Sequence, residues 1–128
     1  NVIPIFAPAS QVRKRVMSVV TDSRAPEEPK DPDECNVFNI YKHFAEPDEV
    51  AAMRRRYMAG GFGYGEVKQE LFQVLERRFG EARIRYDAYV KDRAFLDKML
   101  LDAADHARAI AAPLMRKVRK AVGVRFNR

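Results

Sequence analysis

The sequence has a single cysteine and no long run of apolar residues. Because Cys35 has no second cysteine to pair with, an internal disulfide and a metal site of several cysteines are excluded, which fits a reducing compartment. No segment approaches the roughly eighteen apolar residues that a membrane-spanning helix needs. The chain does not open on the charged, apolar and small-residue series of a signal peptide. We therefore expect a cytoplasmic protein that does not use a membrane as partner.

Motifs that carry catalysis are also missing. The sequence has no Gly-x-Gly-x-x-Gly run after a predicted strand and no phosphate loop of the Walker type. His43 and His106 do not stand at a spacing from Cys35 that indicates a nucleophile with its base. We therefore expect no catalytic residue and no metal site in these 128 residues.

The charge is distributed unevenly along the chain, although the net charge is +6. Residues 1–21 hold three basic side chains and no acid, and residues 22–49 hold nine acids against three bases. Residues 50–128 carry eighteen bases and nine acids, so both ends of the chain are basic. A segregated basic surface favours an anionic partner such as nucleic acid. An ordinary solvated helical surface explains the same pattern equally well.

Four glycines fall within six residues at 60–65, and an apolar stripe with a spacing of four follows them. The stripe consists of Val67, Leu71, Leu75 and Phe79, which share one face of a helix. A glycine loop that leads into a helix leaves backbone N–H groups open for a phosphate or carboxylate. The commoner arrangement is that such glycines only end and start helices. The stretch by itself favours this arrangement, with Gly60 and Gly61 ending one helix and Gly65 starting the next.

The rest of the pattern predicts an all-α bundle of about five helices, after a short extended segment at 1–6. The expected ends are a cap at Ser10, a cap at Asn36, Pro47 at a first helical position, Gly60 as a stop, Asp92 as a cap and Gly123 as a stop. Three prolines at 26, 29 and 32 predict an acidic surface loop over 21–34.

Two long helices should end the chain, one from Gly65 to about Lys91 and one after Asp92. Gly80 should not interrupt the first, because the apolar stripe keeps its phase beyond it. The second has apolar residues at alternating spacings of three and four, and Pro113 should kink it. We expect these two helices to pack antiparallel along that seam.

Four stretches of the chain are informative together: VIPIFAPASQVRKRVMSVVTDS, ECNVFNIYKHFA, AGGFGYGEVKQEL and AFLDKMLLDAADHARAIAAPLMRKVRKAVGV. They resemble, in the same order, the C-terminal part of bacterial tryptophanyl-tRNA synthetases, which are class I enzymes. The opening Asn-Val-Ile-Pro looks like the segment that follows the catalytic KMSKS loop of that family. The resemblance therefore implies a fragment, with residues 1–21 ending the catalytic region and residues 22–128 forming the anticodon-binding domain.

The resemblance also implies what the whole enzyme does. It would use ATP and Mg²⁺ to activate tryptophan and attach it to tRNA(Trp), as a homodimer with a nucleotide-binding domain that precedes this chain. The fragment itself would hold no cofactor and would be inactive alone. The equivalent domain of a tyrosyl-tRNA synthetase is the nearest alternative. A non-catalytic helical protein-interaction module, whose stripes bury a partner helix, is the alternative from another class.

Six residues are the candidates for tRNA binding. By resemblance, the anticodon lies between the mouth of the proline-rich loop, with Asp22 and Arg24, and the helix start with Lys68. Asp22 supplies an acceptor and Arg24 a set of donors for unpaired bases, and Lys68 suits a phosphate. A role of Asp22 in capping a turn explains that residue equally well. The last helix adds Arg116, Lys117 and Lys120 in a segment, 108–128, that holds seven bases and no acid.

Overall fold

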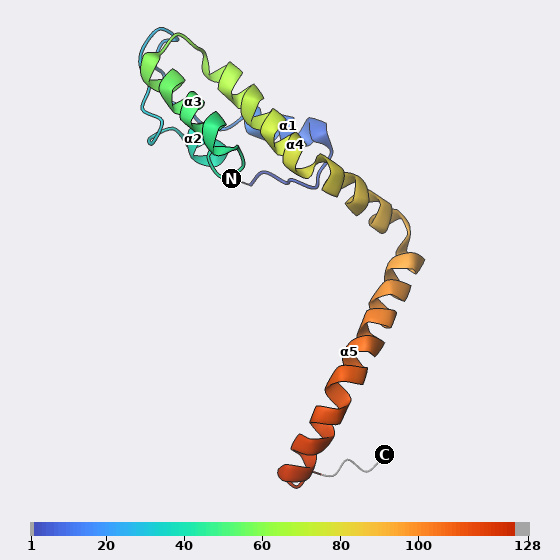
Figure 1. Ribbon diagram of the computed structural model, residues 1–128. Helices are drawn as coiled ribbons and strands as arrows, with labels where there is room; N and C mark the ends of the chain where they lie inside the picture. Colours follow the sequence, from blue (N-terminus) through green and yellow to red (C-terminus); the bar gives the residue numbers. More distant parts are fainter. Residues whose placement is uncertain (1, 125–128) are drawn as a thin grey trace. The chain divides into compact units, whose positions relative to one another are not determined.

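The computed structural model describes residues 2–124, and this part of the chain contains helices and no strand (Figure 1). The helices are α1 (Ala9–Met17), α2 (Asn36–Tyr41), α3 (Pro47–Ala59), α4 (Tyr64–Lys91) and α5 (Arg93–Ala121). The predicted all-α class, with two long helices at the end, is confirmed. None of the helices in this range is long and apolar enough to cross a membrane.

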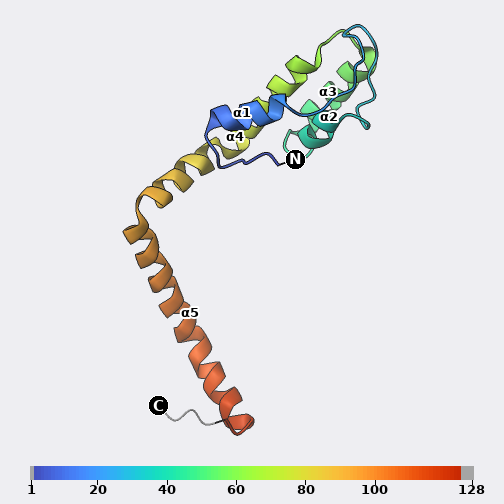
Figure 2. The same cartoon turned by 180° about the vertical axis from the view of Figure 1, so that it is seen from behind.

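The chain divides into two compact units, Asn1–Tyr86 and Asp87–Arg128, and the boundary falls inside α4. In the first unit α1, α2 and α3 lie beside the first part of α4 in both views (Figures 1 and 2). Their contact faces form one apolar core, in which the largest fully buried side chains are Tyr57, Phe38 and Phe62. The ring centres of Tyr57 and Phe62 are 4.9 Å apart. Burial of each such side chain contributes about 1.5–3 kcal/mol.

Glycine ends α3 as predicted. Gly60 and Gly61 have φ angles of 73° and 81°, which L-residues rarely adopt, and α4 begins at Tyr64. A Cβ on Gly60 would lie 2.5 Å from the backbone oxygen of Glu27. The absence of a side chain at Gly60 therefore also allows the proline-rich loop to lie close to the end of α3. The other glycines of the loop, Gly63 and Gly65, have no positive φ.

The helix starts are partly as expected. Pro47 is the first residue of α3, and Glu46 and Glu49 form a capping box around it. The predicted cap at Ser10 is wrong, because α1 begins at Ala9 and Pro8 is its N-cap residue. Asn36 does not cap α2 either. It is the first helical residue, and its Nδ2 donates a hydrogen bond to the Val20 carbonyl oxygen (3.1 Å).

The proline-rich loop is irregular, as predicted, but it is organised by a buried lysine. Lys30 is 3% exposed, and its Nζ donates to the carbonyl oxygens of Ala25 (2.9 Å), Pro26 (3.0 Å) and Glu28 (2.9 Å). The same nitrogen lies 4.6 Å from the centre of the Phe62 ring. The acidic composition of the loop indicated a solvated surface and did not predict this burial.

The α5 helix begins and ends as predicted. Asp92 accepts a hydrogen bond from the Phe95 backbone N–H (2.9 Å), and Gly123 has a φ of 74° just beyond the last turn. Helix α4 continues through Gly80, and α5 continues through Pro113. No side chain of α5 is buried, and Ile110 and Leu114 of the apolar seam are 68% and 63% exposed. The expected antiparallel packing of this seam stays a prediction.

Candidate nucleic-acid interface

The loop mouth and the start of α4 meet through one short hydrogen bond. Tyr64 donates its hydroxyl proton to Oδ1 of Asp22 (2.7 Å), although the two residues are 42 positions apart. The same oxygen accepts from the Arg24 backbone N–H (3.1 Å), so the local turn foreseen for Asp22 also forms. The two segments that the sequence analysis paired are thus in contact.

Asp22 is held in its ionised form. The hydrogen bond from Tyr64 is the largest cause of a lowered pKa at Asp22, and the Arg24 backbone N–H and the Arg24 and Lys30 charges lower it further. Burial and the Asp22 charge raise the pKa of the Tyr64 hydroxyl, so this tyrosine keeps its proton. Asp22 is therefore a pure hydrogen-bond acceptor at neutral pH.

The Arg24 side chain is oriented by the loop in which it lies. Its Nη1 donates to the Pro29 carbonyl oxygen (3.1 Å), and its Nε is 3.5 Å from Oδ2 of Asp22. The side chain is still 44% exposed, so the rest of the guanidinium fork is accessible. Asp22 and Arg24 together present an acceptor and several donors at one exposed place.

Lys68 and the glycine loop have hydrogen-bond partners within the chain. The Lys68 Nζ donates to the Met17 carbonyl oxygen at the end of α1 (3.2 Å), which uses one of its three protons. The Gly63 backbone N–H donates to Oε1 of Glu66 (3.1 Å), and Arg56 pairs with Glu66. The carboxylate of Glu66 thus occupies one of the backbone N–H groups that a glycine loop before a helix could offer to an external anion.

The three basic candidates at the chain's end lie in the second unit. Arg116, Lys117 and Lys120 are exposed side chains near the end of α5. Asp22 belongs to the first unit, and these three residues form a basic segment of the second unit. Tyr64 and Lys30 are the residues that the sequence analysis missed. For Tyr64, the only signal in the sequence was its position among four glycines.

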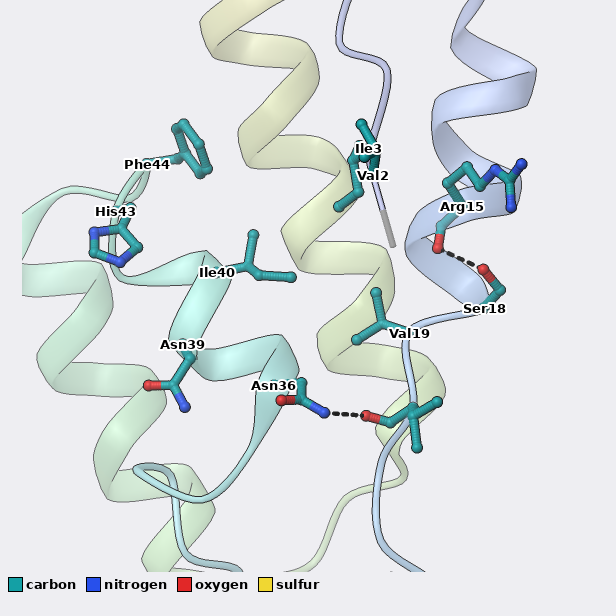
Figure 3. A pocket seen from close by; sticks show the side chains of 11 residues that line it. Val2, Ile3, Arg15, Ser18, Val19, Asn36, Asn39, Ile40, His43 and Phe44 are labelled. Atoms are coloured by element: carbon teal, nitrogen blue, oxygen red, sulfur yellow. Dashed lines mark hydrogen bonds between the residues drawn. The ribbon is translucent and has the colours of Figure 1, made fainter.

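A groove of about 580 Å³ lies between the N-terminal segment, α1 and α2 (Figure 3). Ile3, Val19, Ile40 and Phe44 supply its apolar surface, and these side chains pack against the core. Val2, Val20 and the side chains of two asparagines, a serine, a histidine and an arginine line the rest, and no acidic residue does. Among residues 2–124, no group of three or more His, Cys, Asp or Glu side chains is placed to hold a metal ion.

Comparison with known proteins gives close relatives but no match to a family model. The chain is 45% identical over 128 residues to the tryptophan–tRNA ligase of Pseudomonas aeruginosa, covering 100% of this chain and 28% of that protein. It is 39% identical over 125 residues to the tryptophan–tRNA ligase of Rhodopirellula baltica, covering 98% of this chain and 39% of that protein. The chain therefore spans between 28% and 39% of the length of these two curated relatives.

Solved structures agree with this result. The crystal structure of tryptophanyl-tRNA synthetase from Campylobacter jejuni, in complex with ADP and tryptophan, superposes with a TM-score of 0.84 at 36% identity. The match covers 96% of this chain and 39% of that one. A second structure of the same C. jejuni enzyme gives a TM-score of 0.83. The similarity thus extends from sequence to fold over nearly the whole chain.

Proposed function

We propose that this chain, which is homologous along its whole length to the C-terminal part of bacterial tryptophan–tRNA ligases, is the anticodon-binding part of such an enzyme. Residues 1–21 would end the catalytic region, and residues 22–128 would form the tRNA-binding domain. The whole enzyme would work in the cytoplasm as a homodimer and attach tryptophan to tRNA(Trp). The tryptophan-specific names of the relatives favour this function over a tyrosine-specific one.

ATP and Mg²⁺ belong to the proposed activity of the whole enzyme, in which ATP activates the carboxyl group of tryptophan. The described residues do not form a cluster that fits a metal ion. The sequence has no phosphate loop of the Walker type. We therefore assign no step of this chemistry to the 128 residues and expect them to be inactive alone.

The observation that carries the proposal is the contact between Asp22 and Tyr64. A carboxylate held by a tyrosine from another helix and by its own loop is already oriented before a ligand arrives. Arg24 lies beside it and is oriented by the Pro29 carbonyl. Unpaired bases are read by acceptors and donors placed in this way on their exposed edges. Preorganisation lowers the entropy cost of that recognition.

The test compares variants of the complete enzyme on two tRNAs, one with a tryptophan anticodon and one without. Asp22→Asn and Arg24→Ala should narrow the affinity difference between the tRNAs by roughly 1–3 kcal/mol, the scale of one base contact. Lys68→Ala should weaken both tRNAs alike and reduce the salt dependence by about one unit of slope. Arg78→Ala, which removes an exposed charge from another part of α4, is the control.

Two outcomes would count against the proposal. If the parent enzyme does not bind either tRNA, the function is wrong. If it binds and both Asp22→Asn and Arg24→Ala discriminate between the two tRNAs as well as the parent does, the anticodon contacts another part of the chain. Arg116, Lys117 and Lys120 would then be the next residues to replace.

A further inference from the structure

The N-terminal segment, residues 2–8, runs beside α4 (Figures 1 and 2) and is held there by two adjacent contacts. The Arg83 Nε donates to the Ile5 carbonyl oxygen (3.1 Å), although the two residues are 78 positions apart. Next to this bond, the Phe6 ring stacks on the Tyr86 ring, with centres 5.1 Å apart and an interplanar angle of 30°. Residues 2–8 form no helix or strand, so the position of the segment depends on contacts of this kind.

Arg83 is buried in an arrangement that leaves one of its donors unpaired. The residue is 7% exposed, and its Nη1 donates to Oε2 of Glu76 (2.9 Å). The Nη2 of the same guanidinium is buried and has no hydrogen-bond partner among residues 2–124. A buried ion pair with an unsatisfied group adds little net stability, because the cost of desolvation opposes the attraction. The effect of the Glu76 contact is instead to orient the guanidinium, with Nε directed at the Ile5 carbonyl oxygen.

Helix α4 joins this contact to the proposed anticodon site. Tyr64, in the first turn of the helix, donates to Asp22 (2.7 Å), and Arg83 lies further along the same helix. A rise of 1.5 Å per residue places the two positions about 28 Å apart. Between them, Leu71 and Leu75 are buried in the core, so packing fixes this part of α4. One packed helix therefore orients Asp22 at one position and holds the N-terminal segment at another.

We infer that Arg83 is a positioning residue, through which α4 couples the tRNA contacts at Asp22 and Arg24 to the catalytic region of the whole enzyme. The inference rests on the proposed function, in which residues 1–21 end that catalytic region. In this role Arg83 contacts neither the tRNA nor the reacting atoms. It fixes residues 2–8 on the helix whose first turn orients Asp22, and packed elements of this kind carry coupling between distant sites.

The test measures the attachment of tryptophan to tRNA(Trp) by the complete enzyme and its variants. Arg83→Ala should lower kcat roughly 2- to 30-fold, the range of couplings carried through packed elements, and should leave the KM for tRNA unchanged. Arg83→Lys keeps a donor for the Ile5 carbonyl oxygen and should restore most of the kcat. Arg85→Ala, which removes a mostly exposed arginine two residues away, is the matched control and should behave like the parent.

The coupling itself is measured by combining Arg83→Ala with Asp22→Asn in one enzyme. Asp22→Asn should lower kcat in the parent background, and it should lower kcat by a smaller factor when Arg83→Ala is already present. Residues that act through one connected element show such non-additive effects, whereas independent sites do not. Val37→Ala, which removes core volume from α2, separates coupling from a general loss of stability. It should leave kcat unchanged at a temperature where every variant is folded.

Three results would overturn the inference. They are independent effects of Arg83→Ala and Asp22→Asn on kcat, a loss of kcat with Val37→Ala as large as with Arg83→Ala, and a raised KM for tRNA at unchanged kcat in Arg83→Ala. Failure of the proposed function is recognised separately. In that case the parent enzyme does not bind tRNA or does not attach tryptophan to it.

Discussion

Lys30 is the residue on which the order of the proline-rich loop depends. A buried ammonium group is costly unless its protons find acceptors, and here the three protons meet three backbone carbonyl oxygens. The rings of Phe62 and Tyr64 lie 4.6 Å and 5.5 Å from the same nitrogen and add a favourable cation–π contribution. Through Tyr64, this lysine also supports the side chain that orients Asp22.

Replacing Gly60 should be far more damaging than replacing Gly80. Gly60 has a φ of 73° and a ψ of −159°, a conformation nearly restricted to glycine, and an added Cβ would collide with the Glu27 backbone. Gly60→Ala should therefore lower the free energy of unfolding by at least about 2 kcal/mol. Gly80 lies inside α4 with nothing within 4 Å of an added Cβ, and Gly80→Ala should raise it by up to about 1 kcal/mol.

Urea unfolding of the two variants and the parent measures both effects. Equal destabilisation by the two alanines would contradict the different roles assigned to the glycines. A neutral Gly60→Ala would show that the loop relaxes away from the end of α3.

At the scale of elements, α4 connects most of the first unit. Its first turn contacts the loop mouth through Tyr64, and its middle supplies the core residues Leu71 and Leu75. Further along, Arg83 is 7% exposed and donates to the Ile5 carbonyl oxygen (3.1 Å) and to Glu76 (2.9 Å). Arg83 thereby attaches the N-terminal segment, which lines one side of the groove, to this helix.

Arg83→Ala should lower the free energy of unfolding by about 1.5–3 kcal/mol, because it leaves Glu76 and the Ile5 carbonyl oxygen without their charged donor. Arg85→Ala is the matched control two residues away. Its partner Glu81 is 3.9 Å distant and both side chains are mostly exposed, so the change should stay within about 0.5 kcal/mol. Thermal unfolding followed by circular dichroism distinguishes the two. If Arg85→Ala lowered the free energy of unfolding as much as Arg83→Ala does, burial of the Arg83–Glu76 pair would not explain its contribution to stability.

For the whole molecule, we expect stability to fall in acid. The pKa values of Asp22, Asp33 and Glu49 are lowered from 3.8 for Asp and 4.5 for Glu, mainly by hydrogen bonds from Tyr64, Arg54 and Arg77 respectively. A carboxylate with a lowered pKa in the folded state stabilises that state above the ordinary pKa. This contribution is lost as the pH falls through the lowered value.

The melting temperature should therefore decrease between about pH 5 and pH 2. The double change Asp33→Asn with Glu49→Gln removes two of the three groups, so its melting temperature should depend less on pH over the same range. An equally steep dependence in the double variant would assign acid sensitivity to other groups.

The sequence by itself determined the helices, most of their ends and the similarity to one family. Apolar periodicity, the proline at the start of α3, Asp92 before α5 and the glycines after α3 and α5 act within a few residues, so they can be recognised without a fold. The resemblance was also carried by contiguous stretches. Local signals gave the wrong caps at Ser10 and Asn36, because capping depends on the surroundings of the residue. Helix α1 begins at Ala9, and the Asn36 side chain donates a hydrogen bond to the Val20 carbonyl oxygen.

Only the tertiary structure decided which of the candidate groups are free to act. Lys30 is buried because distant rings and carbonyls enclose it, and Asp22 is oriented by Tyr64 from 42 positions away. Glu66 accepts a hydrogen bond from the Gly63 N–H, and Lys68 donates one to the Met17 carbonyl oxygen at the end of α1. The groove exists because three separate segments meet there. Each of these depends on contacts between residues far apart in the chain, which spacing along a sequence does not encode.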